Sequence, residues 1–193
     1  FAKKPFDYYG VTPGDKDEAM KPIIKPLHDG AYRSGLIQVT EDADTHKLKV
    51  KIPPLRHLMA KPKRLASGHG ACPGCGIFSA LELFYKGIEG DVVTLMQTGC
   101  GYVTSAAYPH SSHKQTFIHN LFQNGPATLS GTIEAFFEMK ARGEIEVADD
   151  FTFLMVSGDG GMDIGMGSAI GTALRGHKMI MLEYDNEGYM NTG

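Results

Sequence analysis

The sequence has no tryptophan, only three cysteines and no uncharged apolar run of 18 residues. Without such a run, no membrane-spanning helix is predicted. There is also no internal repeat, no low-complexity segment and no RNA-binding or helix-turn-helix signature, so a nucleic-acid-binding role is not favoured. What is present, 42% apolar and 21% charged side chains among 193 residues, is typical of one globular domain with room for an appended arm.

The charge is unevenly distributed, although the net charge is only −3. Residues 1–65 contain 13 Lys and Arg against 8 Asp and Glu, whereas residues 66–193 contain 6 against 14. A basic segment joined to an acidic domain favours docking against other protein surfaces. We therefore interpret residues 1–65 as an N-terminal arm for subunit docking, and residues 66–193 as the main domain.

The arm is rich in proline and has little periodicity. Two segments, 36–40 and 46–52, alternate apolar and polar residues and predict two strands of a hairpin. The rest is expected to run extended over another subunit, with a disordered tail as the alternative for residues 1–30. No signal peptide is visible, and because the sequence begins at Phe1 rather than methionine, we expect its start to be missing.

The main domain alternates short apolar runs with segments of helical periodicity. The runs that predict strands are 91–97, 115–119, 151–157 and 179–184, and the helical segments are 78–88, 126–143 and 162–174. This alternation predicts an α/β fold with a doubly wound, mostly parallel sheet.

A glycine-rich turn, Gly158-Asp159-Gly160-Gly161, follows the strand at 151–157, and the strand after it ends at Asn186. In such a βαβ unit the carboxyl ends of both strands open on one crevice, where ligands of open α/β sheets bind. The Asp159 carboxylate, the Asn186 amide and free backbone carbonyls suit Mg²⁺, which commonly also binds phosphate oxygens. An isolated Gly-Asp-Gly is more often only a tight turn. The second motif favours a metal-bridged diphosphate instead.

The three cysteines are Cys72, Cys75 and Cys100, and the first two flank a Pro-Gly turn. They could belong to a zinc site completed by a histidine such as His69. They could include a CxxC redox pair, or they could be three of the four ligands of an iron–sulfur cluster. Spacing alone favours zinc.

The separation of 27 residues between Asp159 and Asn186 resembles the thiamin diphosphate-binding motif. The string from Tyr184 to Gly193 is similar to the thiamin diphosphate-binding (beta) subunit of the 2-oxoacid:ferredoxin oxidoreductases, in particular the multi-subunit pyruvate and 2-oxoisovalerate enzymes. The resemblance covers about residues 66–193 and implies a thiamin diphosphate-type sheet that is truncated at its C-terminal end.

The resemblance also implies a set of site residues. Mg²⁺ is expected on the Asp159 and Asn186 side chains and the Gly188 carbonyl, and His119 and Asn191 are the expected catalytic residues. The expected cofactor-binding residues are Gly99, Gly101, Asn120, Gly158, Asp159, Gly160, Gly161, Asn186, Gly188, Tyr189, Asn191 and Thr192.

The segments around Cys72, Cys75 and Cys100 resemble those that hold the family's [4Fe–4S] cluster, and this replaces zinc as the favoured interpretation. The family's fourth cysteine lies beyond the asparagine loop. We therefore expect the chain to be a fragment, rather than a chain whose fourth ligand comes from elsewhere.

The sequence departs from the family at two positions that commonly carry glutamate, where Ile77 and Gln123 stand. Both changes concern expected substrate-side contacts and not the expected metal ligands. Among the nearby histidines, His110 and His113 are expected to be ordinary surface residues, whereas His119 could be a core, loop or substrate-contacting residue.

The implied function is oxidative decarboxylation of a small 2-oxoacid with thiamin diphosphate and Mg²⁺. Electrons would pass to the [4Fe–4S] cluster and then to ferredoxin or another acceptor, with coenzyme A as the cosubstrate. A partner subunit is expected to supply the glutamate at the aminopyrimidine ring, and the cluster chemistry implies a cytoplasmic setting. The alternatives are a non-redox thiamin diphosphate decarboxylase or carboligase, and a structural zinc-binding module.

Overall fold

The computed structural model describes residues 38–43, 45–51, 55–88, 90–107, 109–147 and 151–191. The predictions for residues 1–30 and for Thr192 lie outside these ranges. The chain forms two compact units, residues 1–61 and 62–193, and each is described by itself.

In the first unit, strands β1 (Gln38–Glu41) and β2 (Leu48–Lys51) pair antiparallel, which confirms the predicted hairpin. Asp42 stabilises the connection between β1 and β2, because its carboxylate accepts a hydrogen bond from the Lys49 ammonium at 2.6 Å. Helix α2 (Leu55–Ala60) follows, so the expectation that the remainder of the arm is extended was wrong for these residues. They are mostly good helix formers preceded by two prolines, which are favourable near a helix start.

The second unit is built on a four-stranded sheet in which every neighbouring pair is parallel, with the order β4-β3-β5-β6. The strands are Asp91–Gln97 (β3), Thr116–Asn120 (β4), Phe151–Gly158 (β5) and Ile180–Tyr184 (β6). All four predicted strands are therefore present within one residue at each end. The central strands β3 and β5 are apolar because they are buried on both faces, as is usual in parallel sheets.

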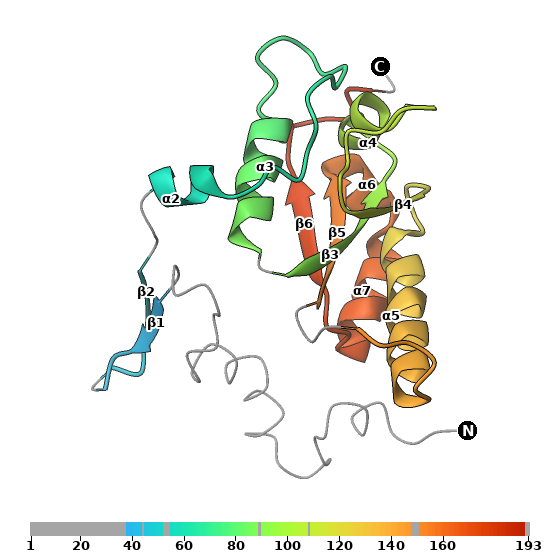
Figure 1. Ribbon diagram of the computed structural model, residues 1–193. Coiled ribbons are helices and arrows are strands. Elements are labelled where there is room, and N and C mark those ends of the chain that lie inside the picture. Colours follow the sequence, from blue (N-terminus) through green and yellow to red (C-terminus); the bar gives the residue numbers. More distant parts are fainter. Residues whose placement is uncertain are drawn as a thin grey trace. The chain divides into compact units, whose positions relative to one another are not determined.

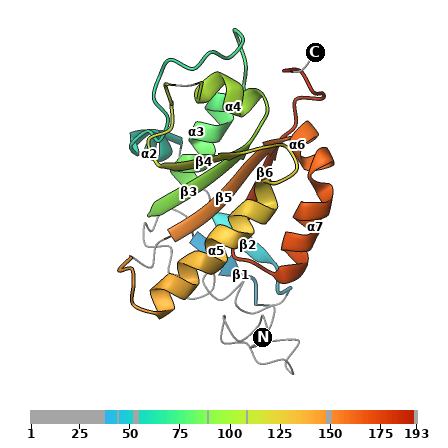
Figure 2. The ribbon, with the colours of Figure 1, turned by 90° about the vertical axis from the view of Figure 1, so that its right-hand side faces the viewer.

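Helices cover both faces of this sheet, which confirms the doubly wound α/β prediction (Figures 1 and 2). Helix α3 (Ile77–Gly87) packs Phe78, Leu81 and Tyr85 against one face of β3 and β5. Helix α5 (Gly125–Ala141) packs Leu129 and Ile133 against the other. Alternate residues of the strands enter the two cores, as the two-residue period of a strand requires.

The helix predicted behind the Gly-Asp-Gly turn is divided in two, α6 (Asp159–Ile164) and α7 (Met166–Arg175), at Gly165. A side chain at Gly165 would lie 3.0 Å from the Phe122 carbonyl oxygen, so only glycine fits where the two helices meet the loop after β4. A short helix, α4 (Cys100–Ser105), follows β3, where no helix was predicted. Within the described residues, no helix is long and apolar enough to cross a membrane.

In this strand order, the direction of the connections between strands reverses at the boundary between β3 and β5. The chain passes from β3 to β4 on one side and from β5 to β6 on the other. The carboxyl ends of β3 and β5 flank the crevice in which open α/β sheets bind ligands. Helices α4 and α6 begin beside those two ends, at the top of the sheet in Figure 1.

Candidate functional site

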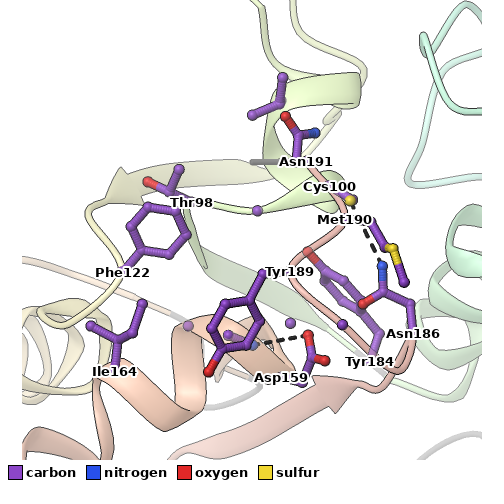
Figure 3. A pocket seen from close by; sticks show the side chains of 16 residues that line it. Thr98, Cys100, Phe122, Asp159, Ile164, Tyr184, Asn186, Tyr189, Met190 and Asn191 are labelled. Atoms are coloured by element: carbon purple, nitrogen blue, oxygen red, sulfur yellow. Dashed lines mark hydrogen bonds between the residues drawn. The ribbon is translucent and has the colours of Figure 1, made fainter. Parts of the chain in front are cut away.

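A pocket lies at this reversal point (Figure 3). Its wall brings together the end of β3, the start of α6 and the loop after β6. The predicted residues that line it are Gly99, Cys100, Gly158, Asp159, Gly160, Gly161, Asn186, Gly188, Tyr189 and Asn191. Most of the site expected from two separate motifs is therefore collected in one place.

Three polar groups converge in this pocket, namely the Asp159 carboxylate, the Asn186 amide and the Gly188 carbonyl. The Asn186 side-chain oxygen lies 3.2 Å from the Asp159 Oδ1 and 3.2 Å from the Gly188 carbonyl oxygen. Adjacent ligands of an octahedral Mg²⁺, each at about 2.1 Å, are roughly 3.0 Å apart. The Asn186 amide thus lies at nearly the spacing that the ion requires from each of the other two predicted ligands. Without a cation, the turned amide is the favoured orientation, because its N–H₂ then donates to both oxygens.

The loop after β6 is folded by its own polar groups. The Glu187 N–H donates to the Asp185 carboxylate at 2.8 Å, and Glu187 has a left-handed backbone (φ 62°). Such conformations in residues other than glycine are uncommon and cluster at functional sites. The Gly188 carbonyl accepts the Met190 N–H at 2.9 Å and has a second lone pair left for a cation.

Tyr189 lies over the first turn of α6. A side chain on Gly160 would lie 2.7 Å from the Tyr189 ring, so the glycine is needed for this approach. The Tyr189 hydroxyl donates to the Asp163 carboxylate at 2.9 Å, and this bond raises the tyrosine pKa. The contact joins the loop after β6 to α6.

Tyr184 is a site residue that the sequence prediction missed. Its ring packs against three glycines, Gly99, Gly101 and Gly158, at each of which a side chain would lie within 3.0 Å of the tyrosine. Its hydroxyl accepts the Gly101 N–H at 2.9 Å, and burial raises its pKa. These glycines were predicted to bind a cofactor. Each makes room for the tyrosine, and Gly101 does not line the pocket.

Gln97 was also missed, although it is completely buried at the end of β3. Its amide donates to the Phe122 carbonyl, and Phe122 lines the pocket. Gly125 and Gly161 leave the space that its side chain fills, because an added Cβ would lie 2.6 Å from its Cδ and 3.3 Å from its Oε1, respectively. A polar residue at the end of an apolar strand was the only signal in the sequence.

His119 and Asn120 do not line the pocket, contrary to their expected roles. The His119 ring stacks on Tyr102 with centroids 3.4 Å apart and forms a hydrogen bond with the Thr98 hydroxyl at 3.0 Å. Burial lowers its pKa. The Asn120 amide donates to the Thr128 hydroxyl, and its oxygen accepts the Leu121 N–H at 2.7 Å. Both residues contact the pocket through Thr98, whose hydroxyl forms hydrogen bonds with the His119 ring and the Asn120 carbonyl.

His113 differs from the expected surface histidine. It forms a hydrogen bond with the buried Ser105 hydroxyl at 3.0 Å and stacks on Phe117. Burial lowers its pKa to about 4, so the ring is neutral near neutral pH. His110 is exposed, as expected.

The three cysteines line a second pocket together, and Cys100, Tyr184 and Asn186 line both pockets. The chemistry of three thiols facing one cavity fits an iron–sulfur cluster that takes a further ligand from elsewhere. Within the described residues, however, no three His, Cys, Asp or Glu side chains lie close enough to hold a metal ion. His69, the candidate fourth zinc ligand, stacks on Phe78 with centroids 4.2 Å apart. The cluster therefore stays a prediction.

The two departures from the family pattern lie near the site without entering the metal ligands. Ile77 lines the second pocket beside the cysteines. The Gln123 backbone carbonyl accepts the Ser168 hydroxyl of α7 at 2.6 Å.

No protein-family model matches the chain. Over 138 residues it is 39% identical to the pyruvate synthase subunit PorB of Thermotoga maritima, covering 67% of this chain and 41% of that protein. The PorB of Methanothermobacter marburgensis is 39% identical over 130 residues, with 67% and 43% covered. The ketoisovalerate oxidoreductase subunit VorB of Pyrococcus furiosus is 34% identical over 149 residues, with 76% and 45% covered. The chain thus spans less than half the length of these relatives.

Proposed function

This chain is a relative of the beta subunits of 2-oxoacid:ferredoxin oxidoreductases, and from that premise we propose that it carries the thiamin diphosphate site of such an enzyme. The observation that supports the proposal best is that one terminal atom of the Asn186 amide lies 3.2 Å from both the Asp159 Oδ1 and the Gly188 carbonyl oxygen, at the point where the sheet connections reverse. Mg²⁺ would be held by these three atoms and by the diphosphate of the coenzyme.

The residues around the cation would orient the coenzyme. Gly160 and Gly161 line the pocket at the start of α6, where Tyr189 lies over Gly160, so the diphosphate would lie beside this turn and the Tyr189 ring. Tyr184 fixes the turn that carries Cys100, and Asn191 lies in the pocket wall, where it can contact the reacting part of a substrate. When bound, thiamin diphosphate supplies the carbanion chemistry that releases CO₂ from a 2-oxoacid.

The redox part of the proposal depends on the second pocket. Cys72, Cys75 and Cys100 would hold a [4Fe–4S] cluster together with a ligand from outside the described residues. Because Cys100 and Asn186 line both pockets, the two cofactors would be neighbours. Electrons would leave through the cluster to ferredoxin or another acceptor, and coenzyme A would accept the acyl group.

The site is expected to be shared with a partner subunit. Asp159 is the only carboxylate in the wall of the first pocket among the described residues, and it is assigned to the cation. As the family resemblance implies, the carboxylate that thiamin needs at its aminopyrimidine ring would come from a partner subunit. The isolated chain is expected to be inactive.

Anaerobic assays test this function. The chain assembled with its partner subunits should reduce a viologen dye when given thiamin diphosphate, Mg²⁺ and a 2-oxoacid. Asp159→Asn should weaken thiamin diphosphate binding at least about tenfold, since even changes around metal ligands commonly cost that much. Glu144→Gln, a change on the surface after α5, is the matched control. Turnover by the chain alone would contradict the shared site.

Iron and sulfide analysis separates this function from the alternatives. A non-redox thiamin enzyme would retain the Asp159 and Asn186 site and contain no iron. A structural zinc module would contain one zinc and bind no coenzyme. The proposal requires iron, acid-labile sulfide and thiamin diphosphate in the same assembly.

A further inference from the structure

Asn186 contacts both pockets with opposite ends of one amide group. One end of the amide lies 3.2 Å from both the Asp159 Oδ1 and the Gly188 carbonyl oxygen, and the other end lies 3.7 Å from the Cys100 sulfur (Figure 3). The distance of 3.7 Å is within hydrogen-bonding range, because hydrogen bonds to sulfur are longer than those to oxygen. The single amide therefore spans the wall between the two pockets. Resting on the function proposed above, we infer that Asn186 couples occupancy of the cation site to the redox state at Cys100.

The coupling follows from the asymmetry of the amide. With a cation between the three oxygens, the Asn186 oxygen must face the cation, and the N–H₂ group then faces Cys100. Without the cation, half a turn of the amide lets the N–H₂ donate to Asp159 and Gly188 at 3.2 Å each. The sulfur would then face a carbonyl oxygen. Occupancy of the cation site therefore decides whether the Asn186 amide presents its N–H₂ donor or its oxygen to the Cys100 sulfur.

A donor at this sulfur changes the ease of reduction. When a [4Fe–4S] cluster accepts one electron, no bond forms or breaks, and the added negative charge is shared by the sulfur atoms. An N–H donor stabilises the reduced form more than the oxidised form, and hydrogen bonds to the sulfurs are among the factors that set cluster potentials. A cation on the amide oxygen also polarises the N–H bonds and strengthens that donor.

Because coupling between two sites is reciprocal, it can be measured either as a shift in the midpoint potential of the cluster or as a change in coenzyme affinity. If thiamin diphosphate–Mg²⁺ raises the midpoint potential of the cluster, the reduced protein must bind the coenzyme more tightly by the same factor. We expect about tenfold tighter binding to the reduced form, which equals about 59 mV for a one-electron couple. A loaded site would then have a cluster prepared to accept the electron.

The test is a dithionite titration of the assembled enzyme, followed by electron paramagnetic resonance, with and without thiamin diphosphate–Mg²⁺. Asn186→Asp retains an oxygen ligand but has no N–H in either orientation, so its coenzyme-dependent shift should fall below about threefold. Ala80→Asp adds the same charge to an exposed position in the wall of the second pocket and retains the Asn186 donor, so its shift should match the wild type.

Each outcome decides a different claim. Equal potentials with and without coenzyme in the wild type would overturn the coupling, as would an undiminished shift in Asn186→Asp. Loss of the shift in both variants would assign it to charge alone and also overturn the role of the amide. Absence of a cluster signal or of coenzyme binding in the wild type would instead refute the proposed function.

Discussion

Substitution of Gly125 by alanine tests how the wall behind the pocket is packed. Gly125 begins α5, and an added Cβ would lie 2.6 Å from the Cδ of Gln97, which is completely buried. Neither group has space to move, since the Gln97 amide is bonded to the Phe122 carbonyl. Overpacking of this kind costs about 1–3 kcal/mol, with this contact at the upper end. Alanine returns at most about 1 kcal/mol through helix propensity. The expected net loss is about 2 kcal/mol.

Gly131→Ala is the matched control, because Gly131 lies in the same helix and nothing lies within 4 Å of an added Cβ. It should stabilise the protein by up to about 1 kcal/mol. Urea denaturation followed by far-ultraviolet circular dichroism measures both free energies of unfolding. In a Gln97→Ala background the cost of Gly125→Ala should fall below about 1 kcal/mol, because its steric partner is gone. Equal effects of the two glycine substitutions, or an unchanged cost without Gln97, would refute the packing argument.

Three further predictions concern the same unit. Burial lowers the His113 pKa from 6.5 to about 4, so the unfolded chain binds the proton more readily than the folded chain. The free energy of unfolding should therefore fall by at most about 3 kcal/mol as the pH decreases from about 6.5 to 4. His113→Gln should remove this pH dependence from urea unfolding curves, and an unchanged dependence would assign it to other groups. Tyr184→Phe leaves the Gly101 N–H without its partner and should cost about 1–3 kcal/mol in the free energy of unfolding, so a neutral result would mean that water replaces the hydroxyl. Tyr189→Phe removes the hydrogen bond to Asp163, but the ring still covers Gly160. It should weaken thiamin diphosphate binding by less than about tenfold and leave the free energy of unfolding unchanged. Calorimetry measures the affinity, and complete loss of binding would contradict a role limited to joining the loop after β6 to α6.

The strands of the main domain could be predicted because burial on both faces leaves short apolar runs bounded by glycine. The carboxyl-end position of Asp159 and Asn186 followed from the same pattern, and the structure brings them together. Helix α4 could not be predicted, because it has only six residues, among them Gly101, Val103 and Thr104, which are poor helix formers. A helix this short shows no apolar periodicity.

The roles of the glycines could not be predicted for a related reason. A glycine near a ligand site and a glycine that accommodates a neighbouring side chain look identical in a sequence. Gly99 and Gly101 pack against Tyr184, which is 83 residues from Gly101 along the chain. Only the fold brings the two segments together. His119, the last residue of a predicted strand, was likewise expected to be catalytic, whereas its ring stacks on Tyr102 and forms a hydrogen bond with Thr98.

The cation site is tested most directly by an anomalous-difference map of crystals of the assembled enzyme grown with thiamin diphosphate and Mn²⁺ in place of Mg²⁺. The account predicts one peak at ligand distance, about 2.2 Å, from the Asp159 carboxylate, the Asn186 side-chain oxygen and the Gly188 carbonyl, with the diphosphate on its other side. A peak elsewhere, or a coenzyme bound away from the carboxyl ends of β3 and β5, would contradict it.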